Sequence, residues 1–128
     1  MQILLDTHVL LWALADDPVL PAKARALIAD DRNTLWVSAV SIWEISIKHA
    51  LGRGDMPLSG TTALGYCRDA GFWWLDIRPE HAAAVEALPL IHADPFDRML
   101  VAQALTEPMR LLTHDSMIAR YDPNILLV

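Results

Sequence analysis

The 128 residues of this chain are enough for one domain, and 54% of them are hydrophobic while only 20% are charged. This balance excludes a disordered chain and predicts a single globular domain over residues 1–128, with a substantial core. The formal net charge of −6 argues against a protein that coats nucleic acid through bulk attraction, but it is compatible with an enzyme that reaches phosphates through metal ions.

Short apolar runs alternate with helical patterns along the chain. In chain order we predict a strand at 3–5, helices at 8–15 and 21–30, a strand at 34–37, a helix at 38–52, a loop at 53–57, a helix at 61–70, a strand at 72–77, helices at 79–88 and 94–107, and strands at 110–113 and 125–128.

Apolar strands separated by helices are typical of parallel βαβ units with right-handed crossovers. We therefore predict the α/β class in three layers, α/β/α, with a central and mainly parallel sheet that has helices on both faces. An antiparallel meander, or a helix at 72–77, would contradict this prediction.

Several acidic residues are expected at one edge of this sheet. Ligands of open parallel sheets bind outside the carboxyl ends of the strands. Asp6 follows the first predicted strand, and Asp115 follows the fourth. Glu44 lies in the early turns of the third predicted helix, and Asp97 lies in the first turn of the sixth. We therefore expect these four carboxylates to converge.

Converging carboxylates repel one another unless cations neutralise them. Hard oxygen ligands without cysteines or paired histidines favour Mg²⁺ or Mn²⁺ over zinc. Such a metal activates a water molecule and stabilises the charge of a phosphodiester transition state. The pattern of acids therefore predicts a metal-dependent enzyme that hydrolyses phosphodiester bonds.

Most of these acids also have a structural interpretation. Asp94 directly precedes a proline, which is typical of a helix N-cap, and we interpret Asp94 as a cap rather than a ligand. Ser41 and Glu44 match a capping box, and Asp115 is suited to cap the short turn that follows it. Asp6 directly follows an apolar strand, where an acid has little local structural purpose, and this favours a functional role.

Other kinds of active site lack their motifs. The sequence contains no Gly-x-Ser-x-Gly elbow, no glycine-rich phosphate loop and no His-Glu-x-x-His pair. Five histidines are scattered along the chain, and we interpret His92 and His114 as solvated loop residues, with a contact to substrate as the alternative.

Sorting signals and cysteine sites are not expected. The N-terminal apolar run has no basic opening and is interrupted by Asp6, unlike a signal peptide. No segment reaches the roughly 18 apolar residues of a membrane-spanning helix. Cys67 is the only cysteine, which excludes an internal disulfide and a cysteine-based zinc site. We expect a cytoplasmic protein with no membrane partner.

Four motifs carry a family resemblance. They are Leu-Leu-Asp-Thr-His at 4–8, Ser-Ile-Trp-Glu-Ile at 41–45, His-Ala-Asp-Pro-Phe-Asp-Arg-Met-Leu-Val-Ala-Gln-Ala at 92–104, and Leu-Thr-His-Asp at 112–115. In their order and spacing the chain resembles PIN-domain proteins along essentially its whole length, and among these the VapC-type toxins of type II toxin–antitoxin systems. The Asp-Pro-Phe-Asp-Arg stretch is the most specific part of the resemblance.

The resemblance implies an endoribonuclease that uses Mg²⁺ or Mn²⁺, acts on structured RNA such as transfer RNA, and is inhibited by a cognate antitoxin. Matched by position, Asp6 and Asp97 are the principal metal ligands, and Glu44 and Asp115 complete the acidic set.

In the same motifs Thr7 and Thr113 have supporting roles. The resemblance also implies a homodimer. Large apolar residues such as Trp12 and Trp43 are consistent with this, because they exceed what one small core can bury.

Several alternatives remain at this stage. A haloacid-dehalogenase-like phosphatase with Asp6 as nucleophile would need a second acid two residues later, where this chain has His8. A non-catalytic RNA-binding module would favour a basic surface, which the net charge opposes. A structure-specific DNA nuclease would need more chain to clamp branched DNA. A PIN-fold nuclease that processes RNA without being a toxin is the remaining alternative.

Overall fold

The central feature of the fold is one parallel sheet. The computed structural model describes residues 1–54 and 56–128, so that Asp55, in the predicted loop at 53–57, lies outside the described residues. Within the described part, five strands pair in the order β3-β2-β1-β4-β5, and every pair is parallel. The strands are β1 (Gln2–Leu5), β2 (Thr34–Ser38), β3 (Trp73–Leu75), β4 (Arg110–Thr113) and β5 (Leu126–Leu127). The predicted α/β class and parallel sheet are confirmed.

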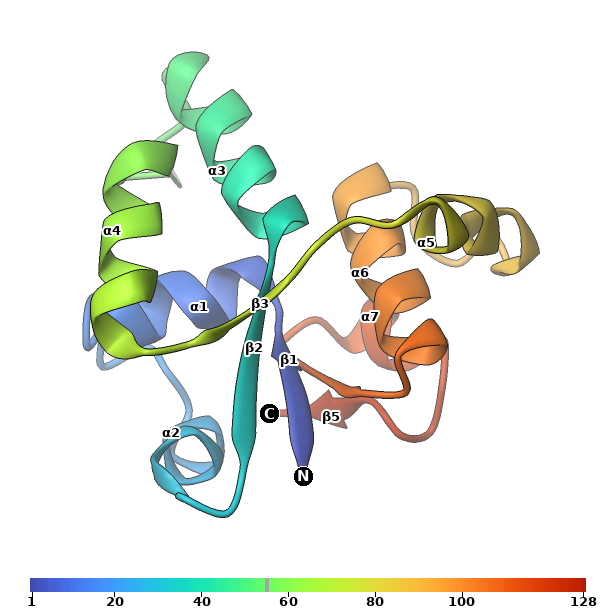
Figure 1. The fold of residues 1–128 in the computed structure, drawn as a ribbon, viewed down its shortest axis with the longest axis horizontal. Coiled ribbons are helices and arrows are strands. Elements are labelled where there is room, and N and C mark those ends of the chain that lie inside the picture. The colour runs from blue at the N-terminus through green and yellow to red at the C-terminus, as the bar shows by residue number, and fades with distance from the viewer. Residues whose placement is uncertain (55) are drawn as a thin grey trace.

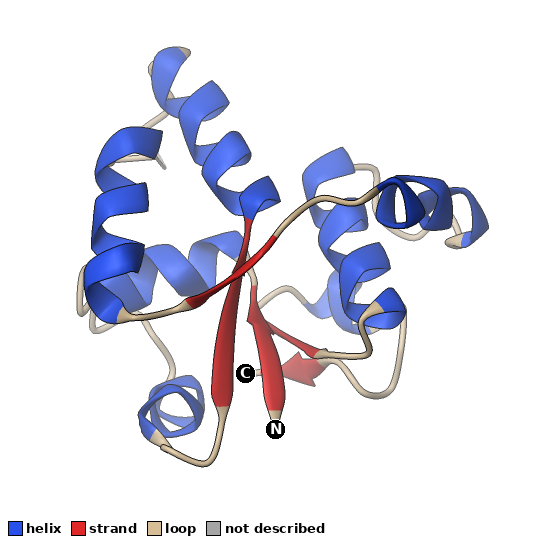
Figure 2. Ribbon diagram, in the orientation of Figure 1, coloured by secondary structure: helices blue, strands red, loops and turns tan. Residues whose placement is uncertain are grey.

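Helices cover both faces of the sheet (Figure 1). They are α1 (Thr7–Leu14), α2 (Ala22–Ala29), α3 (Ala39–Ala50), α4 (Gly60–Ala70), α5 (Pro79–Ala84) with a 3₁₀ turn at Val85–Ala87, α6 (Pro95–Thr106) and α7 (Ser116–Ala119). In Figure 1, α1, α2 and α4 lie to one side of the strands and α5, α6 and α7 to the other, and Figure 2 shows the strands as the middle layer. Within residues 1–54 and 56–128, no helix combines the length and apolarity required to cross a membrane.

The first strand joins the two layers of the core. Ile3 and Leu5 pack into one cluster with α1 and α2, whereas Leu4 packs into the other with α6. This alternation follows from the two-residue period of a strand, whose successive side chains point to opposite faces. All three side chains are fully buried, and burial of each contributes on the order of 2 kcal/mol. The buried side chains therefore fix β1 in the core, including Leu5 at its carboxyl end.

The third helix begins one residue later than predicted. The Ser38 Oγ accepts a hydrogen bond from the Val40 N–H at 3.0 Å, and α3 therefore begins at Ala39. The capping box that Ser41 and Glu44 match by their spacing does not form, because both residues lie inside this helix.

The predicted strand at 72–77 is shorter in the structure. Its residues Trp73–Leu75 pair with β2, and the chain then leaves this edge of the sheet for α5.

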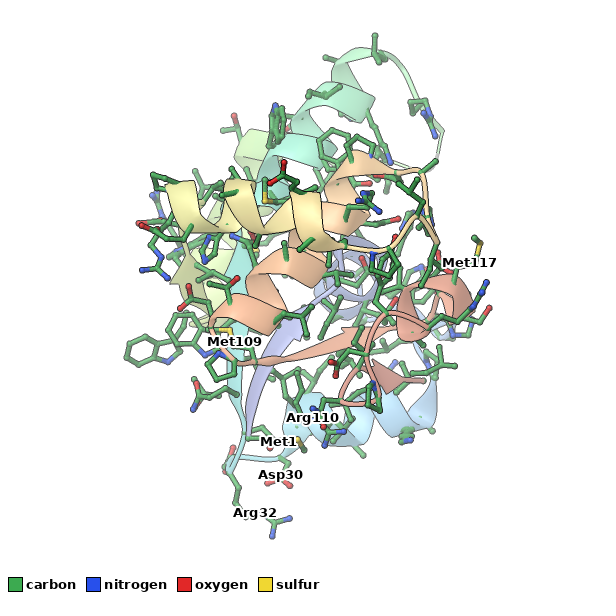
Figure 3. All side chains as sticks on the ribbon, turned by 90° about the vertical axis from the view of Figure 1, so that its right-hand side faces the viewer. Met1, Asp30, Arg32, Met109, Arg110 and Met117 are labelled. Atoms are coloured by element: carbon green, nitrogen blue, oxygen red, sulfur yellow. The ribbon has the colours of Figure 1, made fainter. Side chains whose placement is uncertain are left out.

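The amino ends of the strands carry exposed polar contacts. The Met1 ammonium donates to the Arg32 carbonyl oxygen at 3.3 Å, and the Arg32 guanidinium pairs with the Asp30 carboxylate at 2.8 Å. Figure 3 shows these residues together at one end of the molecule, with Arg32 extending outwards. Exposed pairs of this kind contribute less than about 1 kcal/mol. The buried acids gather at the opposite end of the strands.

Candidate active site

The site lies where the topology of the sheet changes direction. β1 has β2 on one side and β4 on the other, and Leu5 at the end of β1 is level with Leu112 in β4. The chain passes from β1 to β2 and β3 on one side, whereas β4 and β5 form the other side. In parallel sheets this arrangement leaves a crevice at the carboxyl ends of the two central strands.

Asp6 is anchored at the floor of this crevice. Its Oδ1 accepts a hydrogen bond from the Thr7 N–H at 2.8 Å, and its Oδ2 accepts one from the Thr113 hydroxyl at 2.7 Å. The Thr7 hydroxyl in turn donates to the Ser41 Oγ at 2.9 Å. Asp6 is therefore also the N-cap of α1, and the prediction that it has little local structural purpose is wrong: α1 begins at the very next residue.

Glu44 enters the crevice from α3 and is almost fully buried. The Lys48 ammonium, one turn further along α3, contacts the Glu44 Oε2 at 2.5 Å and lies 4.0 Å from the Asp94 Oδ2. The Lys48 Nζ also lies 5.6 Å from the centre of the Phe96 ring. Burial lowers the pKa of Lys48, but the hydrogen bond and negative charge of Glu44 outweigh it and raise that pKa above its usual value. Lys48 therefore stays charged and neutralises one of the acids.

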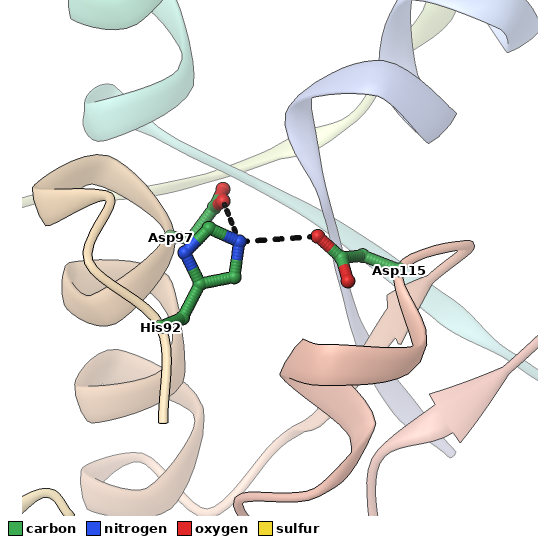
Figure 4. A group of neighbouring side chains, drawn as sticks. All are labelled: His92, Asp97 and Asp115. Atoms are coloured by element: carbon green, nitrogen blue, oxygen red, sulfur yellow. Dashed lines mark hydrogen bonds and ion pairs between the residues drawn. The ribbon is translucent and has the colours of Figure 1, made fainter. Parts of the chain in front are cut away.

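Two aspartates at the start of α6 have different positions. The Asp94 Oδ1 accepts hydrogen bonds from the Phe96 N–H at 2.8 Å and from the Asp97 N–H at 3.2 Å. Asp94 is therefore the N-cap of α6, as predicted. Asp97 is in the first turn of the same helix, and its carboxylate faces Asp115 across the crevice (Figure 4).

Asp115 both caps a helix and belongs to the acidic site. Its Oδ1 accepts a hydrogen bond from the Met117 N–H at 2.8 Å, and it caps α7 in this way. Its Oδ2 lies 3.2 Å from the His92 Nε2, which is also 3.3 Å from the Asp97 Oδ2. The Asp115 N–H donates to the Thr113 hydroxyl at 3.0 Å, so Thr113 links Asp6 and Asp115.

One cavity of about 260 Å³ brings the four predicted acids together. Its walls are formed by Asp6, His8, Trp12, Glu44, Lys48, Asp94, Asp97, His114 and Asp115. Thr7 and Thr113 are not among these residues, and their hydrogen bonds to Ser41 and Asp6 support the site from beneath.

The carboxylates of the cavity repel one another. Burial raises the pKa of Asp97 to about 8, with additional contributions from the negative charges of Asp6, Asp94, Glu44 and Asp115. Burial also raises the pKa of Asp6, although hydrogen bonds from Thr113 and Thr7 oppose the shift. Acids whose negative charge is disfavoured in this way gain most from a bound cation.

The donor atoms fit a divalent metal ion. Asp97, Asp115 and His92 each offer an atom within 4.8 Å of the others. The Glu44 Oε1 is buried and has no hydrogen-bond partner among the described residues, although a buried carboxylate oxygen is costly to leave unpaired. Carboxylate oxygens are the ligands that Mg²⁺ and Mn²⁺ favour. Asp6, Glu44, Asp97 and Asp115 are therefore suited to hold such an ion.

The contacts of three residues around the site are not predicted from the sequence. The signal for Lys48 was its position four residues after Glu44, where an oppositely charged side chain on a helix is in reach. Ser41 lies inside α3, where its Oγ accepts a hydrogen bond from the Thr7 hydroxyl. His92 lies in a loop, as predicted, but its side chain is only 19% exposed and its Nε2 lies between two acids.

Comparisons with known proteins agree with this fold. Solved structures similar over nearly their whole chain include VapBC2 from Rickettsia felis bound to a promoter DNA fragment (TM-score 0.69, 16% identity, covering 100% of this chain and 98% of that one). VapBC-1 from nontypeable Haemophilus influenzae has a TM-score of 0.63 and 15% identity, and the match covers 100% of this chain and 97% of that one. A toxin–antitoxin complex from Klebsiella pneumoniae has a TM-score of 0.64 and 18% identity, and the match covers 97% of this chain and 95% of that one. Comparison with the sequences of curated proteins gives no match. The model of the PIN domain matches residues 3–123, and the chain therefore belongs to the PIN-domain family.

Proposed function

We propose that this protein is a VapC-like toxin of a type II toxin–antitoxin system and an endoribonuclease that requires Mg²⁺ or Mn²⁺. The observation that carries the proposal is the convergence of Asp6, Glu44, Asp97 and Asp115 in one cavity at the carboxyl ends of β1 and β4. Membership of the PIN-domain family supports nuclease activity. The likeness in fold to the VapBC structures, over nearly the whole of each chain, supports the toxin role.

The four acids would hold the metal ion. A bound Mg²⁺ or Mn²⁺ supplies a water molecule of lowered pKa and positive charge beside the phosphodiester. The chain's own part is to fix the ligands before substrate arrives. Asp6 is held by two hydrogen bonds, and Asp115 by the start of α7. The Lys48 ammonium holds one oxygen of Glu44 and leaves the other unpaired.

One wall of the cavity is suited to a nucleotide. The half-buried Trp12 ring lies 5.5 Å from the His114 ring and 6.2 Å from the His8 ring, measured between ring centres. Aromatic side chains beside a phosphate site offer unpaired bases a stacking surface. This wall favours single-stranded or looped RNA, and we propose structured RNA such as transfer RNA as the substrate.

The metal requirement gives the direct test. We expect the purified protein to cleave RNA in millimolar Mg²⁺ or Mn²⁺ and to lose all activity in excess EDTA, because uncompensated carboxylates would repel the phosphate. Gel analysis of RNA fragments, with readdition of metal as the control, measures this. Full activity in EDTA would refute the mechanism. A non-catalytic RNA-binding module would bind RNA without cleaving it in either condition.

The proposed homodimer and antitoxin can each be tested by experiment. We propose that the free protein is a homodimer and that an antitoxin encoded beside it covers the acidic cavity. Trp43 on α3 is 52% exposed, and Leu51, the C-cap of this helix, is 73% exposed, which supports burial against another chain. Light scattering should give twice the mass of one chain, and co-expression with the neighbouring open reading frame should relieve growth arrest. A monomer whose toxicity no neighbouring gene relieves would favour an RNA-processing nuclease outside toxin–antitoxin systems.

A further inference from the structure

His92 occupies an unusual place among the acids of the site. Its ring lies in the loop before α6, and its Nε2 is within hydrogen-bonding distance of Asp97 and Asp115 at once (Figure 4). By distance alone, this nitrogen is as suitable a metal ligand as the two carboxylates. The hydrogen bond at the opposite ring nitrogen, Nδ1, shows whether Nε2 can be a metal ligand or is a hydrogen-bond donor.

The opposite ring nitrogen accepts a hydrogen bond. The backbone N–H of Asp94 points at the His92 Nδ1 from 3.1 Å. A backbone N–H is always a donor, so Nδ1 carries no proton and the proton of the neutral ring is on Nε2. Metal-binding histidines show the reverse arrangement, in which the nitrogen away from the metal donates to an acceptor. An Nε2 that carries a proton has no lone pair to offer a metal ion.

The loop that carries His92 is fastened on its far side. The His92 N–H donates to the Tyr121 Oη at 2.8 Å, and the Arg98 guanidinium donates to the same oxygen at 3.1 Å. Arg98 also donates to the carbonyl oxygens of Pro89 at 2.9 Å and Val85 at 3.3 Å. The backbone of this loop is therefore fixed by contacts that lie outside the acidic cavity, and the Asp94 N–H orients the ring.

We propose that His92 is a positioning residue that donates its Nε2–H to Asp97 and Asp115, and that it is not a ligand of the metal. The proposal rests on the proposed function, because it concerns the same metal site. The shared N–H orients both carboxylates towards one point between α6 and α7 and reduces their repulsion while no cation is bound. Each carboxylate oxygen has a second lone pair, so the same bonds persist when a metal ion arrives.

The tautomer can be observed directly. We expect long-range ¹H–¹⁵N spectra of the intact protein to show His92 protonated at Nε2 without metal and still protonated there with saturating Mg²⁺. The spectrum of His92→Gln identifies the signals of this ring among the five histidines. Loss of the Nε2 proton when Mg²⁺ binds would overturn the proposal and make His92 a ligand, and so would a proton on Nδ1 in the metal-free protein.

Substitutions test the same role through metal affinity. His92→Gln keeps an N–H donor at similar reach and should bind Mn²⁺ within about threefold of the parent, whereas His92→Phe keeps a ring without a donor and should bind about tenfold more weakly, as loss of an outer-shell partner does. His49→Gln is the control, because His49 contacts the Met56 carbonyl oxygen away from the cavity. Equal weakening by Gln and Phe, or no weakening by Phe, would overturn the proposal. Failure of the parent protein to bind either cation would overturn the proposed function as well.

Discussion

Replacing Asp97 by asparagine should abolish RNA cleavage and leave the fold intact. Burial, together with the negative charges of Asp6, Asp94, Glu44 and Asp115, raises the pKa of Asp97 to about 8. Asparagine has the same shape but lacks the charge that a metal ligand needs. We expect a loss of about two orders of magnitude or more in rate at saturating Mg²⁺, since a bound metal supplies several kcal/mol of transition-state stabilisation.

Asp94, three residues earlier, provides the matched comparison. Its Oδ1 caps α6, and asparagine caps helices about as well as aspartate, so Asp94→Asn should stay close to the parent in both stability and cleavage. Asp94→Ala removes the cap and should cost about 1 kcal/mol of unfolding free energy. The measurements are the RNA cleavage rate and the thermal midpoint of each variant. An inactive but stable Asp94→Asn beside an active Asp97→Asn would reverse the two roles.

The sheet and the convergence of the acids could be predicted because both follow from strand order. β1 and β4 each contain a short apolar run, Ile3–Leu5 and Leu111–Leu112, that is followed by polar residues, and parallel strands bring such ends together. The N-cap at Asp94 was predictable too, since an acid followed by proline is a strong local signal. Features of this kind depend on a few neighbouring residues.

His92 could not be assigned in the same way, and for Lys48 only the contact with Glu44 had a local signal. The position of His92 depends on Tyr121, which is 29 residues away, and on the backbone N–H of Asp94. Lys48 lies beside Asp94 only because α3 and α6 pack together. Contacts between distant segments leave no spacing in the sequence that would predict them.

The raised pKa of Asp97 also predicts how stability changes with pH in the absence of metal. The unfolded chain loses this proton near the usual value of 3.8, whereas the folded protein keeps it up to about 8. Between these values the folded state binds more protons than the unfolded state, so each rise in pH favours unfolding. The raised pKa of Asp6 acts in the same direction. The free energy of unfolding in EDTA should therefore fall between pH 5 and pH 8.

Asp97→Asn should remove much of this decline, because asparagine has no proton to lose. In EDTA its stability relative to the parent should increase between pH 5 and pH 8, by up to a few kcal/mol. Saturating Mg²⁺ should stabilise the parent more at pH 8 than at pH 5, because at pH 5 the ion must displace a proton from Asp97. The same ion should stabilise Asp97→Asn much less at either pH. Urea unfolding at the two pH values, with and without Mg²⁺, measures all four conditions. Asp94→Asn removes only one of the charges beside Asp97 and should keep most of the decline. A metal-free parent whose stability is flat or rises over this range would show that Asp97 is ionised in the folded protein, and the repulsion assigned to the four acids would then be wrong.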